Sequence, residues 1–384
     1  MLLSIGVYSF TGVMLFYLGW HYNKRFTTPL ERHSLKQFLL SWEIIVSFLL
    51  FSVITGLRYH TGWDHEYYIK DYVQYQDEGT FFRSDFEPGF RLLEIIFAKL
   101  GLHYSVFFGF CGLINIFFIY IALRKERALI PWVGVFILTG AYFLHLMNSL
   151  RQGLVECALV SSMLFLCNKK YGWFAVTSLL FVLIHKVSLF IIPLFLLGHG
   201  FLKIKNSKTI AIIYVCCLIV GQFPGLISWT INGFSRLLSV IGYHKYVDLF
   251  NTNPQYSFHR SSFGIVTLML LTTHIYLIAY LSDLRKQFHH DKFLSYCSGL
   301  TMLYICYFVL VMNTAVYFKR PCELLLPSYI IMSAYLMVYL FKNRKYPQLT
   351  TFCIANFSIS TITILKNYYW GNINSTDFYH FIPL

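Results

Sequence analysis

The side chains best suited to chemistry gather in a few short stretches of this sequence. They are Arg58, Asp64 and Tyr68 in RYHTGWDHEYY, Glu87 in FEPGF, Asn148, Arg151 and Gln152 in NSLRQ, His185 in LIHKVS, and Arg320 in YFKRP. Arginine grips a phosphate through two parallel hydrogen bonds and keeps its charge. An aspartate or a histidine can take a proton from a hydroxyl group. Together these residue types suit a phosphorylated substrate that a hydroxyl group attacks.

Arg151 stands in an apolar run, AYFLHLMNSLRQGLVECALVSSMLFL, which looks membrane-embedded on both sides. An arginine at the centre of a bilayer costs at least a few kcal/mol. Either the chain turns at Arg151, or the arginine is needed inside the membrane. The answer depends on where the bilayer lies along the chain.

The composition defines a polytopic membrane protein. Of 384 residues, 57% are hydrophobic and 12% are charged, against roughly 25% charged in soluble domains. The net charge of +14 fits basic loops that hold helices at one side of a membrane, so we expect no nucleic acid partner. The nine cysteines include no CxxC pair, and the sequence predicts neither a metal site nor a cofactor.

The apolar runs predict an all-α bundle of about twelve transmembrane helices in a single domain over residues 1–384. The predicted spans are 2–20, 38–57, 104–123, 130–148, 151–168, 172–187, 188–202, 209–231, 263–282, 293–315, 322–341 and 347–365. Basic residues follow the first run and do not precede it, which predicts a spanning helix with an external N-terminus.

The positive-inside rule then orients the whole bundle. Lysine and arginine clusters fall in alternate short loops, which we assign to the cytoplasm. This assignment leaves two long external segments, 58–103 and 232–262. Within the first, 86–103 is interrupted by three charged residues, so we predict an amphipathic helix on the outer surface. The chain is then expected to turn near Arg151, at the external interface.

Each of these residues also has an ordinary structural interpretation. Arg58 could be an anchor that reaches the membrane interface, His185 a hydrogen-bonded core histidine, and Asp64 a solvated loop acid. Glu87 could cap the surface helix, with Pro88 in its first turn. Their collection on one face favours instead a site for a lipid-linked phosphorylated sugar.

At these positions the sequence resembles the EpsG-like family of Wzy-type O-antigen and capsular polysaccharide polymerases. The resemblance rests on R-x-x-x-G-x-D at 58–64 with Tyr68 after it, the EPGF block at 87–90, N-x-x-R-Q at 148–152, and His185 followed by Ser188. It covers roughly residues 56–190, with Arg320 and Pro383 as weaker matches.

The resemblance implies a glycosyltransferase-C-like membrane bundle in the bacterial inner membrane, with its active site facing the periplasm. The implied reaction transfers a growing glycan from undecaprenyl diphosphate to the non-reducing end of a lipid-linked repeat unit, without a metal. The implied partners are the undecaprenyl-diphosphate-linked oligosaccharide, membrane lipids and a chain-length regulator protein.

We assign Arg58, Arg151 and Arg320 to the diphosphate, and either Asp64 or His185 to the general base. Tyr68, Glu87, Asn148 and Gln152 are assigned to the sugar or to support of the site. The stereochemical course stays open. So do three other functions: a flippase or transporter of lipid-linked oligosaccharide, an O-antigen ligase, and a sugar acyltransferase.

Overall fold

The computed structural model describes residues 2–25, 34–62, 64–139, 142–223, 264–314, 316–369 and 380–381. The second long external segment, 232–262, lies outside these ranges, and so does Pro383. Across the described residues the secondary structure is helical apart from one ladder of two short strands. The predicted all-α class is therefore confirmed.

The described helices fall into two compact units, residues 1–189 with 330–384 and residues 190–329. The helices up to residue 189 are α1 (Leu2–Arg25), α2 (Leu35–Leu39), α3 (Trp42–Gly56), α4 (His65–Glu78), α5 (Pro88–Lys99), α6 (Tyr104–Ala122), η2 (Arg127–Leu129), α7 (Ile130–Thr139), α8 (Tyr142–Asn148), α9 (Leu150–Cys167) and α10 (Tyr171–Phe181).

The remaining elements continue in chain order. They are η3 (Lys186–Phe190), α11 (Ile191–Lys203), α12 (Ser207–Val220), α15 (Ile265–Gln287), α16 (Lys292–Val311), α17 (Val316–Glu323), α18 (Leu326–Lys342) and α19 (Tyr346–Tyr369), with strands β1 (Arg58–Tyr59) and β2 (His380–Phe381).

The number of membrane spans is smaller than the predicted twelve. Among the described residues, eight helical stretches are long and apolar enough to cross a bilayer, or nine if α7 and α8, bent by 65°, form one span. Three predicted spans form helices of only 15, 11 and 14 residues: α3, α10 and α12. At about 1.5 Å per residue these fall short of the ~30 Å hydrocarbon core. Apolar residues in the turns beside α3 and α10 had lengthened two of the predicted runs, and the run that contains α12 extends beyond the described residues.

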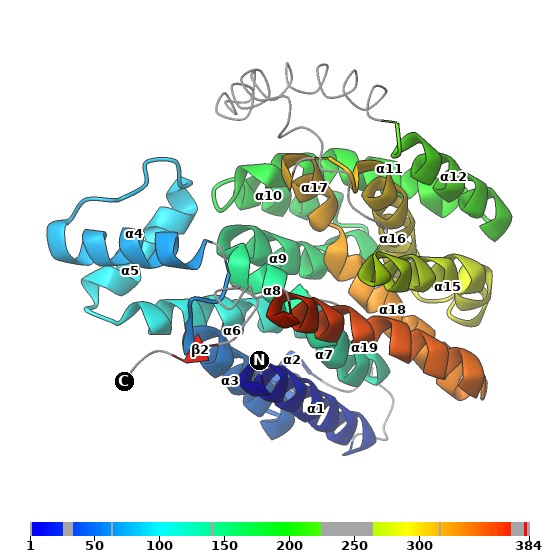
Figure 1. The fold of residues 1–384 in the computed structure, drawn as a ribbon, viewed down its shortest axis with the longest axis horizontal. Coiled ribbons are helices and arrows are strands. Elements are labelled where there is room, and N and C mark those ends of the chain that lie inside the picture. The colour runs from blue at the N-terminus through cyan, green and yellow to red at the C-terminus, as the bar shows by residue number, and fades with distance from the viewer. Residues whose placement is uncertain are drawn as a thin grey trace. The chain divides into compact units, whose positions relative to one another are not determined.

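In the first unit, neighbouring helices pack in the series α10, α9, α6, α3, α1, α7 and α19. The pair α4 and α5 packs together and contacts α6, and Figure 1 shows this pair set apart from the long helices. Its core is aromatic: Tyr68, Tyr72, Phe86 and Phe90 are buried with Phe107 of α6.

The predicted helix exists as α5, with two of its three charged residues turned inward. Arg91 and Glu94 are buried, whereas Leu92 and Ile96 are 57% and 45% exposed. The face that carries Arg91 and Glu94 therefore packs inward, and the exposed Leu92 and Ile96 suit contact with lipid.

In the second unit, α16 packs against α11, α12, α15 and α17. The guanidinium of Arg285, near the end of α15, donates to Ile204 O at 2.7 Å. His274 is fully buried on α15, and its Nδ1 lies 3.2 Å from the hydroxyl of Tyr214 on α12. These polar contacts link helices whose other contacts are largely apolar.

The ladder pairs β1 with β2 in antiparallel register, Arg58 opposite Phe381 and Tyr59 opposite His380. It brings residues 380–381 beside the end of α3, at the beginning of the first long segment that was predicted to be external.

Candidate functional site

The EPGF block positions the site, and each of its residues has a separate task. Glu87 is the N-cap residue of α5, and Pro88 occupies the first turn. The Gly89 N–H donates to Leu183 O at 2.7 Å, and a Cβ on Gly89 would lie 2.7 Å from that same oxygen. Phe90 is fully buried in the aromatic core. The block thus packs the start of α5 directly against the turn that carries His185.

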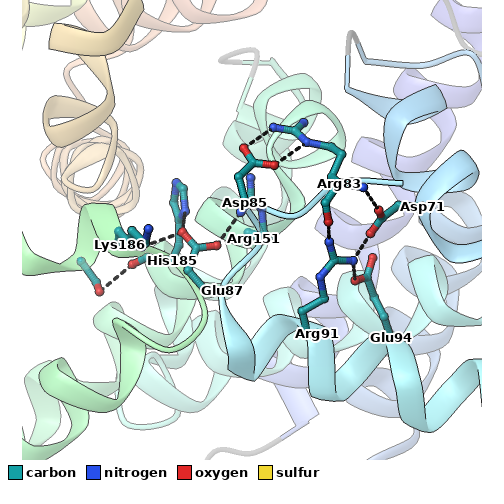
Figure 2. A network of polar contacts seen from close by, with 10 residues as sticks. Asp71, Arg83, Asp85, Glu87, Arg91, Glu94, Arg151, His185 and Lys186 are labelled. Atoms are coloured by element: carbon teal, nitrogen blue, oxygen red, sulfur yellow. Dashed lines mark hydrogen bonds and ion pairs between the residues drawn. The ribbon is translucent and has the colours of Figure 1, made fainter. Parts of the chain in front are cut away.

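Glu87 is the centre of a network that joins three separate segments (Figure 2). Its Oε2 forms an ion pair with Arg151 of α9. Its Oε1 accepts hydrogen bonds from His185 Nδ1 and from the Lys186 N–H, both at 3.0 Å. The glutamate makes no capping hydrogen bond to its own helix. Glu87 therefore links distant segments and does not act as a helix cap.

The electrostatics of Glu87 fix the state of its neighbours. Burial alone would raise the pKa of Glu87, but the hydrogen bond from His185 and the charge of Arg151 outweigh burial and hold the pKa at about 2. An ionised carboxylate can only accept hydrogen bonds. His185 must therefore carry its proton on Nδ1, which makes Nε2 the nitrogen that can take up or release a proton.

Arg151 lies at the break between two helices, since α8 ends at Asn148 and α9 begins at Leu150. A helix break is therefore present where the turn was predicted, and its position at the external interface stays a prediction. The side chain of Arg151 is 12% exposed, and its guanidinium carbon lies 4.0 Å from the centroid of the Phe86 ring. Tyr68, packed against Phe86, also interacts with Arg151.

The R-x-x-x-G-x-D segment is tied to the same helix break. Asn148 accepts a hydrogen bond from the Asp64 backbone N–H at 3.0 Å. Gly62 has φ +96°, and a Cβ there would lie 2.8 Å from Asn148 Cα. Only glycine combines that conformation with so close an approach. Asn148 and Asp64 thus fix where α4 begins.

Two other predicted site residues, Arg58 and Gln152, make contacts outside the Glu87 network. Arg58 is fully buried, with Nη1 donating to Met147 Sδ at 2.7 Å and its guanidinium 5.0 Å from the Phe108 ring centroid. Gln152 donates to Glu156 Oε1 at 2.8 Å, inside the bundle. Arg320 is on α17 of the second unit, and its assignment to the diphosphate stays a prediction.

A second charged network lies within the α4–α5 pair. Arg91 pairs with Asp71, donates to Glu94 Oε2 at 3.1 Å, and donates to the Arg83 carbonyl. The Arg83 N–H donates to Asp71 Oδ1 at 2.6 Å. Burial, together with the charge of Asp71, raises the pKa of Glu94 to about 8. Glu94 is therefore neutral near pH 7, and the network holds one buried charge pair.

A separate ion pair, Arg83 with Asp85, lies between the Glu87 network and the Arg91 network. The Arg83 guanidinium donates from Nε and Nη2 to the two carboxylate oxygens of Asp85, at 2.9 and 2.6 Å. The hydrogen bond from Arg83 lowers the pKa of Asp85 to about 2. The sequence pattern did not indicate Arg83, Asp71 or Arg91 as site residues, although Arg91 is one of the three charged residues that interrupt 86–103. Their only signal was the density of charge in an otherwise apolar chain.

Two acidic residues in the apolar bundle each have a histidine partner. His21 Nδ1 lies 2.9 Å from Glu43 Oε1, and His145 Nε2 lies 2.9 Å from Glu156 Oε1. Pairing lowers the cost of burying a carboxylate. No group of three or more histidine, cysteine, aspartate or glutamate side chains placed to hold a metal ion occurs within the described ranges.

These features define a multi-pass membrane protein with a buried arginine–carboxylate–histidine network beside the ends of its helices. The EpsG family model matches residues 41–375, and the chain belongs to the EpsG family. The matched range contains every residue of the Glu87 network, and the family places the chain in polysaccharide biosynthesis. No curated protein and no solved structure matches the chain.

Proposed function

We propose that this protein is a polysaccharide polymerase. It transfers a growing glycan from a lipid-linked diphosphate to a hydroxyl group of another lipid-linked repeat unit. Membership of the EpsG family supports the class of reaction. The observation that carries the proposal is the Glu87 network, in which one carboxylate contacts both His185, the proposed general base, and Arg151, the proposed phosphate-binding cation.

His185 is the general base in this proposal. Its Nδ1–H is held by Glu87 at 3.0 Å, an arrangement that orients the imidazole and stabilises the imidazolium formed during reaction. Nε2 takes the proton of the acceptor hydroxyl as its oxygen attacks the anomeric carbon of the donor glycan. Asp64 is held at the start of α4 through its backbone and is the weaker candidate.

Arg151 receives the leaving group. As the bond between the anomeric carbon and the diphosphate oxygen breaks, negative charge builds on the diphosphate. A guanidinium stabilises that charge by charge-assisted hydrogen bonds. Glu87 pairs with Arg151 before the donor binds, so one carboxylate sets the position of both the base and the cation.

The proposal includes the setting predicted by the charge pattern and the resemblance. The protein lies in a bacterial inner membrane with this site facing the periplasm, and its substrates are undecaprenyl-diphosphate-linked oligosaccharides. A chain-length regulator is the proposed protein partner. Membership of the EpsG family and a multi-pass helical architecture support this setting.

The direct test is a reaction of the purified protein with undecaprenyl-diphosphate-linked repeat units alone. A polymerase yields a ladder of longer lipid-linked glycans. A ligase needs lipid A–core as acceptor and a flippase makes no new bond, so an unchanged substrate would contradict the proposal.

The base is tested in the same reaction. His185→Ala should reduce the rate by about 10²–10⁴-fold, whereas Asp64→Asn should cost less. His289→Ala, at an exposed histidine on another segment, is the matched control and should behave as wild type. A full loss in Asp64→Asn with normal turnover in His185→Ala would reverse the assignment.

A further inference from the structure

Phe86 is a common platform for three arginines. The guanidinium carbons of Arg151, Arg91 and Arg83 lie 4.0, 4.7 and 4.8 Å from the centroid of its ring. Each guanidinium also has a carboxylate partner. The three differ in access: the Arg91 and Arg151 side chains are 10% and 12% exposed, and that of Arg83 is 24% exposed. Arg83 is therefore the arginine of this group that a ligand reaches most easily.

Arg83 and Arg151 are close enough to hold one ligand together. Since both guanidinium carbons contact the same ring, their separation cannot exceed the sum of their two distances to the centroid. A diphosphate bridged between two guanidinium groups needs no wider spacing. Figure 2 shows the Arg83–Asp85 pair beside Arg151, between the two buried networks.

The Asp85 carboxylate binds the Arg83 guanidinium with the same paired geometry that a phosphate would use. Its two oxygens accept from Nε and Nη2 at 2.9 and 2.6 Å, the paired geometry that arginine also uses for phosphate. The Asp85 side chain is 49% exposed, so it can turn into solvent without leaving a buried charge behind. The pair is a contact that an incoming anion can replace at little cost.

A hollow of about 600 Å³ opens beside Arg83. Arg83 and Phe86 line it together with the aliphatic side chains of Leu92 and Ile95. One part of the hollow therefore offers a cation and another offers an apolar wall. This combination suits an amphiphile that carries a diphosphate on a hydrocarbon chain better than a free inorganic anion.

We propose that Arg83 is a second ligand of the donor's lipid diphosphate, with Asp85 as its resting partner in the absence of donor. This inference rests on the proposed function for the identity of the ligand as a donor. It gives the diphosphate an arginine beside Arg151 within the same unit, a role that the sequence had given to Arg58 and Arg320. When donor binds, Arg83 exchanges Asp85 for a phosphate oxygen and Asp85 turns to water.

The test measures binding of farnesyl diphosphate to the purified full-length protein, with no acceptor present. Arg83→Ala should weaken binding about tenfold or more, and Asp85→Asn should tighten it several-fold because the competing carboxylate is gone. Asp85→Asn should have no effect when Arg83 is already alanine. Glu66→Gln, which alters another exposed ion pair on α4, should leave binding unchanged.

The sign of the Asp85 effect decides the outcome. A structural ion pair predicts weaker or unaltered binding in Asp85→Asn, and either result overturns the proposal. Equal affinity for inorganic pyrophosphate and farnesyl diphosphate would overturn the assignment of the hollow to a lipid. The predicted pattern in a protein that makes no polymer would contradict the polymerase and leave the diphosphate site standing.

Discussion

Two buried arginine–carboxylate networks meet at Phe86, yet they are assembled in different ways. The Asp71–Arg91–Glu94 network is built entirely from α4 and α5, which are close in sequence. The Glu87–Arg151–His185 network joins the start of α5, the start of α9 and the turn after α10. A network within one hairpin can serve only that hairpin. A network that joins three segments brings a base and a cation together, and its geometry depends on the whole bundle.

The largest effect is expected from a substitution that breaks the Asp71–Arg91–Glu94 network of the α4–α5 pair. Arg91→Ala leaves Asp71 buried without its arginine, and loss of one partner of a buried pair typically costs about 3–5 kcal/mol of stability. We expect much less folded protein and a lower unfolding temperature, measured by size-exclusion chromatography after heating. The control is Lys70→Ala, which removes an exposed ion pair on α4, the helix that carries Asp71. An unchanged unfolding temperature for Arg91→Ala would remove the distinction between the two networks.

A somewhat smaller effect is expected from a substitution in the Glu87–Arg151–His185 network. It should change the rate of polymer formation and leave stability unchanged. Arg151→Lys keeps a positive charge near Glu87 but loses the fork that holds a phosphate at two points. Loss of one such contact typically costs about 10²–10³ in rate. The variant should accumulate and unfold like wild type while making almost no polymer in the purified reaction. Wild-type turnover would return Arg151 to a structural role.

The smallest effect concerns Glu94 and depends on pH. Its pKa is raised to about 8 in the folded protein, from an ordinary value of 4.5. The folded state therefore holds a proton that the unfolded chain has lost, and stability falls as pH rises from about 4.5 to about 8. Glu94→Gln removes this loss and should match wild type near pH 5.

Near pH 8.5 the same variant should be more stable than wild type, because by that pH the folded wild type has had to ionise the buried Glu94 carboxyl group. Thermal unfolding across this range measures the difference. A constant difference between variant and wild type would show that Glu94 does not titrate in this window.

The site residues show how far the sequence could lead. The EPGF block and the N-x-x-R-Q segment pointed to Glu87 and Arg151 because backbone demands at Gly89 and a helix break at Asn148 leave a local pattern. The roles within the network left no such pattern. Glu87 was assigned to the sugar or to support of the site, and its place at the centre of the network could not be predicted, because its partners lie 64 and 98 residues away.

The remaining differences have equally physical causes. The charged residues of 86–103 predicted an amphipathic surface helix and a helix is present there as α5, but periodicity shows only that such a helix has two faces. Which face packs inward depends on its neighbours, and here Asp71 of α4 draws the charged face inside. The count of spans failed because hydropathy registers apolar residues in turns as readily as in helices. It cannot show that α10 ends at Phe181.

The β1–β2 ladder sets an order of events during synthesis. Arg58 and Tyr59 emerge early, while His380 and Phe381 follow only after α19 has been made. The backbone groups of β1 that face β2 must wait for this late partner. A chain stopped after residue 379 would keep every candidate membrane span and still lose the strand beside Arg58. A purification tag is therefore better placed away from this segment.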